Sequence, residues 1–310
     1  MVHYNLCIIG GGPAGMTAAI YAGRSGLSTI IIDAMALGGA MATAPIIENY
    51  PGWESITGLE LARIMRKQVE KAGVEIREME KVVEVKLQDK VKTIKTDLEE
   101  YTCDSVIIAT GGERKRLGAK GEADFYGKGV SYCAVCDGAL YKDKNVIVVG
   151  GGNCAASAAL YLKNIARNVT LIHRRDDLRC ESVLKNRLLD CGVKIIWNSV
   201  IRELKGDKTL KTVIVENTID RTLTELPVDG LFIEIGIVPN SSPFHCAGVK
   251  VDEAGYIIVD KDMKTNIPGV FAAGDVTGGV EQISVAVGKG TIAYNSAYEY
   301  IRSLSGKCEL

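Results

Sequence analysis

The feature that most constrains the fold is an internal repeat. Leu6–Gly12, a short apolar run that ends in three glycines, recurs as Val146–Gly152. The offset between the copies stays constant, without a gap, as far as Ile32 in the first copy and Ile172 in the second. Each copy runs from an apolar strand through a glycine turn and an alanine-rich helix to a second apolar strand, the pattern of a dinucleotide-binding βαβ unit. We therefore expect two such units.

The first copy carries the residues of a diphosphate site. Gly10, Gly12 and Gly15 fit this role, because backbone N–H groups approach a phosphate closely at a helix N-terminus only where no Cβ intervenes. Asp33, at the end of the second strand, is predicted to accept hydrogen bonds from the hydroxyl groups of a ribose. A plain tight turn followed by a surface aspartate is the structural alternative.

The second copy differs where its second strand ends. His173 occupies the position of Asp33 in the repeat register, and arginines follow it. A carboxylate there would repel a 2′-phosphate, whereas guanidinium groups bind it through charge-assisted hydrogen bonds of about 1.5–3 kcal/mol each. We predict NADPH in the second unit and FAD in the first, although a solvated basic loop is an alternative. The NADPH candidates are Gly150, Gly152, Asn153, His173, Arg174, Arg175 and Arg179.

A close cysteine pair precedes the second unit. Cys133 and Cys136 have CxxC spacing, which suits reversible dithiol chemistry, and Asp137 follows directly. Zinc is the main rival for such a pair, but zinc commonly needs two of them and the sequence has no second CxxC. Asp137 is either the proton donor and acceptor for the dithiol or a helix N-cap. We predict a redox-active centre and no metal site.

Composition excludes several classes of function. Lys and Arg number 37 and Asp and Glu 38, so the chain lacks the positive field that nucleic acid binding requires. No apolar run approaches the roughly 20 residues that span a bilayer, and the start of the chain does not resemble a signal peptide. We expect a soluble, cytoplasmic protein that binds neither nucleic acid nor membrane. The nine cysteines, odd in number and scattered, do not resemble a secreted disulfide framework.

The 310 residues suffice for two domains. We predict an α/β fold with two Rossmann-like, three-layer dinucleotide-binding domains, the second inserted into the first. Residues 1–112 and 244–310 would form the FAD-binding domain, and residues 113–243 the NADPH-binding domain that carries the CxxC. In the first domain we expect a helix that begins at Thr57, antiparallel strands over 82–87 and 91–96, strands at 256–259 and 270–273, and a helix over 282–303.

These motifs, in this order, resemble the low-molecular-weight thioredoxin reductases over essentially the full length. The resemblance extends to residues 48–52, 109–111, 236, 239–240 and 274–276. It implies that Gly274 and Asp275 reach the ribityl and diphosphate region of FAD and that Asn49 and Gln282 lie near the flavin ring. It also places Gly39, Ala109 and Gly111 in the FAD site.

The resemblance implies a flavoprotein oxidoreductase that takes electrons from NADPH through FAD to the Cys133/Cys136 disulfide and on to a thioredoxin-like protein. Cys136 would face the flavin, Cys133 would attack the partner's disulfide, and Asp137 would handle the protons. A homodimer is implied as well, with a rotation of the domains that presents nicotinamide and disulfide to the flavin in turn.

Four residues depart from the usual family pattern: Ala40, Ser157, Ala158 and Glu281. They leave the phosphate sites intact but leave open the electron donor, for which NADH, ferredoxin and a deazaflavin are alternatives. Another protein disulfide is an alternative acceptor. A non-catalytic redox sensor, whose CxxC only reports oxidation, is the alternative outside enzymes.

Overall fold

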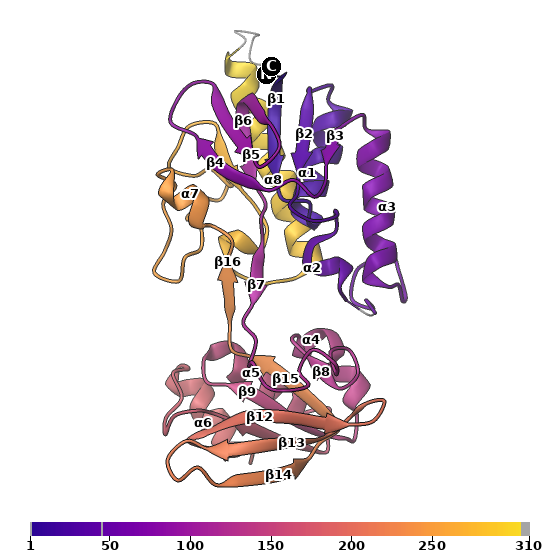
Figure 1. Cartoon of the computed structure of the whole chain (residues 1–310), viewed down its shortest axis with the longest axis vertical. Helices are drawn as coiled ribbons and strands as arrows, with labels where there is room; N and C mark the ends of the chain where they lie inside the picture. Colours follow the sequence, from indigo (N-terminus) through magenta and orange to yellow (C-terminus); the bar gives the residue numbers. More distant parts are fainter. Residues whose placement is uncertain (1, 45, 305–310) are drawn as a thin grey trace. The chain divides into compact units, whose positions relative to one another are not determined.

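The computed structural model describes residues 2–44 and 46–304 of the chain. It divides into two compact units: unit 1 consists of Met1–Glu113 and Val238–Leu310, and unit 2 consists of Arg114–Ile237. The chain thus leaves unit 1, forms unit 2 and returns, which the colour sequence of Figure 1 follows from indigo through magenta and orange to yellow. Both units are α/β, which confirms the predicted fold class with one domain inserted into the other.

Unit 1 is built on a seven-stranded sheet of order β3-β2-β1-β6-β5-β4, in which β17 also pairs with β6. The pairs from β3 to β6 and the β6–β17 pair are parallel, whereas β4 and β5 are antiparallel, as predicted. The strands are β1 (Val2–Ile9), β2 (Thr29–Ile32), β3 (Glu75–Arg77), β4 (Val82–Lys86), β5 (Lys92–Thr96), β6 (Glu100–Ile108) and β17 (Val270–Ala272).

The central strands are apolar because both faces of the sheet are covered. Along β1, Leu6 and Ile8 belong to one buried cluster, while Cys7 and Ile9 belong to a second cluster on the opposite face. This alternation follows from the two-residue period of a strand. The carboxyl ends of β1 and β6 are therefore held by a sheet that is buried on both faces. The first glycine turn begins at Gly10, directly after β1.

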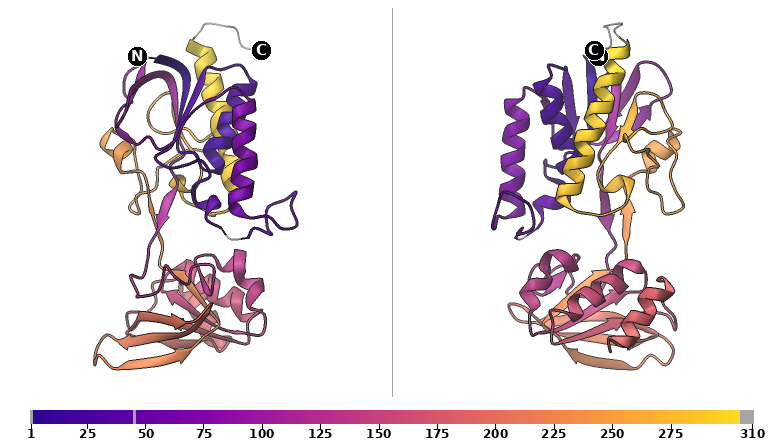
Figure 2. Two further views of the ribbon diagram at one scale, coloured as in Figure 1. Left: turned by 45° about the vertical axis from the view of Figure 1, so that its right-hand side comes forward. Right: turned by 180° about the vertical axis from the view of Figure 1, so that it is seen from behind.

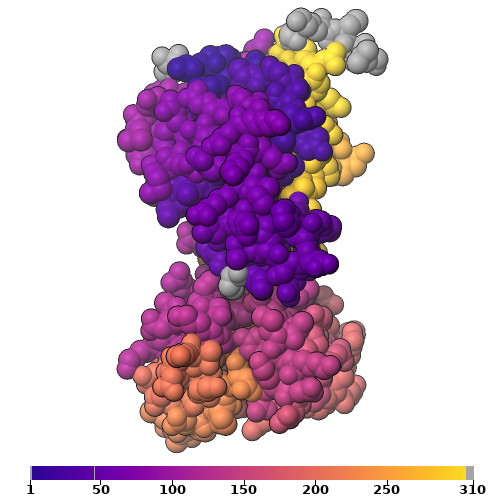
Figure 3. Space-filling view, turned by 90° about the vertical axis from the view of Figure 1, so that its right-hand side faces the viewer, coloured from indigo at the N-terminus to yellow at the C-terminus, as the bar shows by residue number. Residues whose placement is uncertain are grey.

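Three helices, α1 (Pro13–Arg24), α3 (Gly58–Lys71) and α8 (Ile283–Leu304), cover the face of Leu6 and Ile8. Figure 2 shows them together on one side of the sheet, and Figure 3 shows α8 (yellow) beside the N-terminal elements (indigo) on the surface of unit 1. The predicted helix start at Thr57 is confirmed, because its hydroxyl accepts the N–H of Glu60 at 3.2 Å. Shorter helices are α2 (Gly39–Ala42), α7 (Ser242–Cys246) and the 3-10 turn η2 (Asp275–Thr277).

Unit 2 has a five-stranded parallel sheet of order β11-β10-β9-β15-β8 between two layers. Val146 and Val148 of β9 pack towards the helices, and Ile147 and Val149 pack towards a three-stranded antiparallel sheet, β12-β13-β14. The strands are β8 (Val130–Ser131), β9 (Asn145–Gly150), β10 (Asn168–Ile172), β11 (Lys194–Ile196), β12 (Ser199–Gly206), β13 (Leu210–Asn217), β14 (Leu223–Pro227) and β15 (Gly230–Glu234). The helices are α4 (Ala134–Asp137), the 3-10 turn η1 (Gly138–Tyr141), α5 (Asn153–Lys163) and α6 (Ser182–Asp190).

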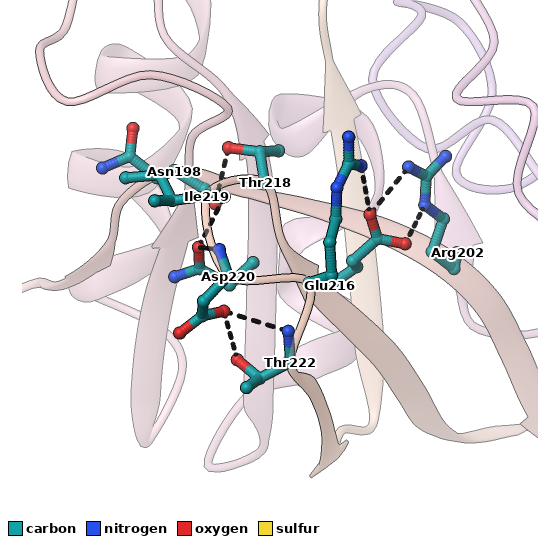
Figure 4. Close-up of polar contacts among 9 residues, drawn as sticks. Asn198, Arg202, Glu216, Thr218, Ile219, Asp220 and Thr222 are labelled. Carbon is teal, nitrogen blue, oxygen red and sulfur yellow. Dashed lines mark hydrogen bonds and ion pairs between the residues drawn. The ribbon is translucent and has the colours of Figure 1, made fainter.

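The antiparallel layer of unit 2 carries an exposed ion-pair cluster. Figure 4 shows Glu216 of β13 between two arginines, with oxygens 2.8 Å from Nε of Arg202 and 2.7 Å from Nη1 of Arg221. In the adjoining turn, Asp220 accepts hydrogen bonds from the backbone and hydroxyl of Thr222 at 2.9 and 2.7 Å. Arg202 thus joins β12 to β13, while Arg221 and Asp220 make their contacts in the turn between β13 and β14.

Two short strands, β7 (Gly112–Arg114) and β16 (Ile237–Pro239), carry the chain out of unit 1 and back, and they pair with each other. The predicted strand at 256–259 is wrong, since Ile257 makes only an isolated bridge with Val251. Within the described residues, no helix is both long and apolar enough to cross a membrane.

Candidate redox and nucleotide-binding sites

The first glycine turn connects β1 to α1, and its glycines serve two different purposes. A Cβ on Gly10, whose φ is +106°, would lie 2.3 Å from the carbonyl oxygen of Ala109, and one on Gly15 would lie 1.9 Å from the carbonyl oxygen of Gly10. These two glycines let strand and helix approach each other. By contrast, a Cβ on Gly12 would meet no atom within 4 Å. The surface at Gly12 is therefore open, at the N-terminus of α1.

Asp33 lies beside this turn, as predicted. Its Oδ2 accepts the N–H of Gly11 at 2.5 Å, and its Oδ1 accepts the N–H of Met35 at 2.7 Å. Burial raises the pKa of the Asp33 carboxyl, and the two N–H donors partly oppose this rise. An ionised carboxylate has about four acceptor positions, so two remain for the hydroxyl groups of a ribose.

Two other predicted FAD residues, Gly39 and Gly274, lie close to the same turn. A Cβ on Gly39 would lie 3.0 Å from Cα of Gly12, and one on Gly274 would lie 3.0 Å from Cβ of Ala14. Gly111, with a φ of +60°, follows the end of β6. The side-chain amides of Asn49 and Gln282 bond to each other at 3.1 Å. The open N-terminus of α1 and the half-used Asp33 carboxylate fit the diphosphate and ribose of FAD.

Unit 2 repeats this construction between β9 and α5. A Cβ on Gly150 would lie 2.3 Å from the carbonyl oxygen of Glu234, whereas one on Gly152 would meet no atom within 4 Å. Asn153 begins α5, and its amide exchanges two hydrogen bonds with Glu181, at 3.0 Å to the Glu181 carboxylate and 2.9 Å from the Glu181 N–H. The open turn fits a second dinucleotide, while Asn153 is held towards the start of α6.

His173 and the three arginines take different places at the end of β10. His173 is only 5% exposed, and a Cβ on Gly151 would lie 2.1 to 2.8 Å from atoms of its ring, so the imidazole lies directly under the glycine turn. Burial lowers the pKa of His173, hydrogen bonds with the backbone of Gly150 and Asp177 partly oppose this, and the positive charges of Arg179 and Arg175 lower it further. The imidazole is therefore neutral near pH 7.

The charge needed for a 2′-phosphate consequently has to come from arginines. Arg174, Arg175 and Arg179 are all exposed, and the backbone N–H of Arg179 donates to the carbonyl oxygen of Gly151 at 2.7 Å. The guanidinium-bearing loop is thus fastened to the glycine turn. His173 Nε2 is buried and has no hydrogen-bond partner of good geometry among the described residues.

Cys133 and Cys136 form a disulfide at the start of α4 in unit 2. Cys136 is exposed and Cys133 is half-buried. Cys133 is the N-cap residue of α4, and its Sγ accepts the N–H of Cys136 at 3.1 Å. After reduction this N–H would stabilise negative charge on the Cys133 sulfur. Among the residues described, no cluster of His, Cys, Asp and Glu side chains could hold a metal ion.

Asp137 is linked to the cysteine pair through Ser131, a residue that sequence reasoning missed. Ser131 Oγ donates to Asp137 Oδ2 at 2.6 Å and accepts the N–H of Cys133 at 3.0 Å. Burial raises the pKa of Asp137, and the hydrogen bond from Ser131 and the charge of Arg114 partly offset that rise. A carboxyl with a raised pKa holds a proton more readily than an ordinary aspartate, and Ser131 joins it to the cysteine pair, which favours the proton-transfer interpretation.

Comparison with known proteins agrees with this geometry. A family model described as pyridine nucleotide-disulphide oxidoreductase matches residues 4–290. A thioredoxin reductase of Listeria innocua is 42% identical over 311 residues, covering 99% of this chain and 96% of that protein. The crystal structure of thioredoxin reductase from Streptococcus pyogenes superposes with a TM-score of 0.91 at 42% identity, covering 97% of this chain and 99% of that one. Thioredoxin reductase from Giardia duodenalis gives a TM-score of 0.93 at 35% identity, with the same two coverages of 97% and 99%.

The chain belongs to the pyridine nucleotide-disulphide oxidoreductase family. Several relatives that match nearly the whole chain are thioredoxin reductases, so the predicted resemblance and the predicted disulfide reductase function are confirmed. The chain is thus a disulfide oxidoreductase, and membership of the family supports FAD and a nicotinamide nucleotide as its cofactors.

Proposed function

We propose that the chain reduces a thioredoxin with electrons that it takes from NADPH by way of FAD. Unit 1 would hold FAD at Gly12, Asp33 and the surrounding segments, and unit 2 would hold NADPH at Gly152 and the arginines. The observation that carries the proposal is the Cys133–Cys136 disulfide, joined through Ser131 to a carboxyl whose pKa is raised. When bound, FAD supplies the hydride-accepting and electron-donating chemistry that no side chain can supply.

The proposed choice of NADPH over NADH rests on the charge at the end of β10. Three exposed arginines and no carboxylate at position 173 favour a 2′-phosphate. The four departures from the family pattern lie elsewhere: Ser157 is exposed and Ala158 is buried on α5, Ala40 is exposed on α2, and Glu281 precedes α8. These positions are the reason to test NADH, reduced ferredoxin and a reduced deazaflavin as alternative donors.

The dithiol chemistry follows from the contacts of the cysteine pair. Cys133, whose sulfur accepts the N–H of Cys136, would attack one sulfur of the thioredoxin disulfide as a thiolate. A bond forms between the two sulfurs, and the other thioredoxin sulfur leaves as a thiolate and takes up a proton. Cys136 would then attack Cys133 Sγ, restore the internal disulfide and release the second thioredoxin thiol. Asp137 would accept and return the protons.

The proposed partners are a thioredoxin-like acceptor and a second copy of the chain, because the relatives are thioredoxin reductases and the family resemblance implies a homodimer. A measured mass of twice 33.3 kDa by light scattering would support the homodimer. A mass of 33.3 kDa at micromolar concentration would contradict it.

The proposal is tested by anaerobic titration of the purified protein with each electron donor. Reduction is followed as the loss of the visible absorbance of the oxidised flavin. NADPH should bleach the flavin at lower concentration than NADH, ferredoxin or a deazaflavin, and an added thioredoxin should restore the oxidised spectrum. Protein without flavin would contradict the cofactor assignment. Bleaching by NADPH without turnover of any thioredoxin would favour the redox sensor.

The division of work between the cysteines has its own test. Cys136→Ser should keep flavin reduction by NADPH but lose turnover, and it should form a stable mixed disulfide with a single-cysteine thioredoxin that is activated as an aryl disulfide. Cys133→Ser is the matched variant and should form much less of this complex. The opposite result would exchange the two roles.

A further inference from the structure

Lys289, in the second turn of α8, directs its ammonium group at the segment after β17. Its Nζ donates to the carbonyl oxygen of Gly278 at 2.6 Å, to the hydroxyl of Thr277 at 2.8 Å and, at 3.5 Å, to the carbonyl oxygen of Gly274. A lysine ammonium has three N–H donors, and all three find acceptors in one short stretch of the chain. We call residues 274–278 the Lys289-bound segment.

This arrangement places a charge among neutral acceptors. Lys289 is half-buried and forms no ion pair with any described residue, and burial lowers the pKa of its ammonium group while the nearby Asp275 carboxylate opposes the shift. Removing a charge from water is unfavourable unless its hydrogen bonds are replaced. The three contacts replace them, so the ammonium and the Lys289-bound segment hold each other in place.

The Lys289-bound segment has little conformational preference of its own. Gly274 and Gly278 have φ values of +81° and +67°, and the next residue, Gly279, has a φ of +88°. Glycine gains this freedom at an entropic cost, since many backbone states compete with the observed one. Within the segment, Thr277 Oγ1 also donates to the Gly274 carbonyl oxygen at 2.8 Å. Loss of the ammonium would remove the three hydrogen bonds that join this turn to α8.

The segment and α8 both meet the first glycine turn. A Cβ on Gly274 would lie 3.0 Å from Cβ of Ala14, and a Cβ on Gly290, the neighbour of Lys289, would lie 2.3 Å from the carbonyl oxygen of Ala14. Ala14 is the second residue of α1 and follows the open position at Gly12. Lys289 therefore fastens together two segments that flank the N-terminus of α1, all within unit 1.

We propose that Lys289 is a positioning residue of the flavin site, which holds residues 274–278 so that Asp275 faces a cofactor bound at the N-terminus of α1. The inference rests on the proposed assignment of FAD to unit 1 and adds a residue that no motif indicates. Lys289 acts through Asp275 and the backbone of the segment, and it does not itself take part in electron transfer.

The test uses the full chain from which flavin has been removed, titrated with FAD and followed by quenching of flavin fluorescence. Lys289→Met should raise the dissociation constant for FAD about 10- to 100-fold, the range expected when hydrogen bonds from a charged group are lost. Lys289→Arg should recover part of the affinity, because a guanidinium can still donate to the same oxygens. Lys261→Met, which removes an exposed lysine of the same unit, is the matched control and should behave as wild type.

A double variant with Asp275 distinguishes a positioning role of Lys289 from a general effect of Lys289 on stability. Asp275→Asn should weaken FAD binding in the wild-type background and have a smaller effect in the Lys289→Met background, because the carboxylate is already displaced there. If Lys289→Met does not fold, Thr277→Val removes one acceptor of the ammonium and should weaken FAD binding in the same direction.

An unchanged affinity of Lys289→Met or Thr277→Val for FAD, or fully additive losses in the double variant, would overturn the inference while the proposed function stands. A wild-type chain that binds no FAD would overturn both.

Discussion

Replacing Gly12 by alanine should weaken FAD binding and leave the fold intact. Gly12 has φ −72° and ψ −177°, which any L-residue adopts, and an added Cβ meets no atom within 4 Å. Substitutions without a clash or a lost contact change stability by about 0.5 kcal/mol or less. The thermal midpoint of flavin-free Gly12→Ala should therefore match that of the flavin-free wild type.

The loss of affinity follows from what occupies the open space at Gly12. A diphosphate that accepts backbone N–H groups at the start of α1 has to approach this Cα closely. A methyl group there forces the phosphate away, and overpacking of this kind costs about 1–3 kcal/mol. A weakened charge-assisted hydrogen bond costs about 1.5–3 kcal/mol. Since the two effects overlap, we expect a total of about 1.5–3 kcal/mol, or a dissociation constant about 10- to 150-fold higher.

Two further glycines act as controls in the same assay, which measures FAD affinity by titration and stability by thermal unfolding. Gly15→Ala places its Cβ 1.9 Å from the Gly10 carbonyl oxygen and should destabilise unit 1 itself. Gly152→Ala, open in unit 2 as Gly12 is in unit 1, should retain FAD and lose affinity for the nicotinamide nucleotide. Wild-type FAD affinity in Gly12→Ala would refute the reasoning, because the diphosphate would then lie elsewhere.

Three other predictions concern charges. Arg174→Ala should raise the KM for NADPH about tenfold or more, because one charge-assisted hydrogen bond is lost, and it should leave the KM for NADH nearly unchanged. Equal effects on both KM values would remove the case for a 2′-phosphate. Asp137→Asn should lower thioredoxin turnover about 10²- to 10⁴-fold. In wild type, turnover should fall at acidic pH as the Asp137 carboxylate, whose pKa is raised, becomes protonated, and Asp137→Asn should abolish this fall. An unchanged fall in turnover at acidic pH would assign the proton transfer to another group. Two arginines lower the pKa of Glu216 from 4.5 to about 2, so its contribution to stability is complete above pH 4.5 and is lost as the pH falls towards 2. Melting of wild type and Glu216→Gln should differ at pH 7 and converge near pH 2, and a constant difference would refute this assignment.

Local patterns predicted the parts of the fold that depend on neighbours in sequence. The repeated strand, glycine turn and helix form as expected in both units, because their order along the chain and the N-terminus of each helix are set by neighbouring residues. The helix at Thr57 begins where a hydroxyl can accept an N–H three residues later. The strand expected at 256–259 failed for a physical reason. Ile257 is 1% exposed and Ile258 is 51% exposed, so the alternation reflects a loop that packs one side chain into the core without pairing its backbone in a ladder.

Contacts between different helices, strands and turns could not be predicted from the sequence alone. Ser131 reaches Asp137 only because β8 and α4 are placed together, and no motif includes a serine at that spacing. Lys289 meets residues 274–278 because α8 packs against α1. The burial of His173 was hidden for the same reason. Its sequence neighbours are arginines, but its ring is covered by Gly151, which is 22 residues earlier in the chain.

The two copies of the repeat place chemically different side chains against the middle glycine of the turn. In unit 1, Asp33 accepts the N–H of Gly11, and in unit 2 the equivalent His173 packs under Gly151. Each side chain supports the middle glycine of its turn. A carboxylate in that place also brings negative charge, which suits an unphosphorylated ribose and opposes a 2′-phosphate. The neutral imidazole supports the turn without this repulsion, so position 173 adds no negative charge beside the exposed arginines. On this reasoning, His173→Asp should preserve the turn and weaken NADPH more than NADH, since it restores the chemistry of the first copy to the second.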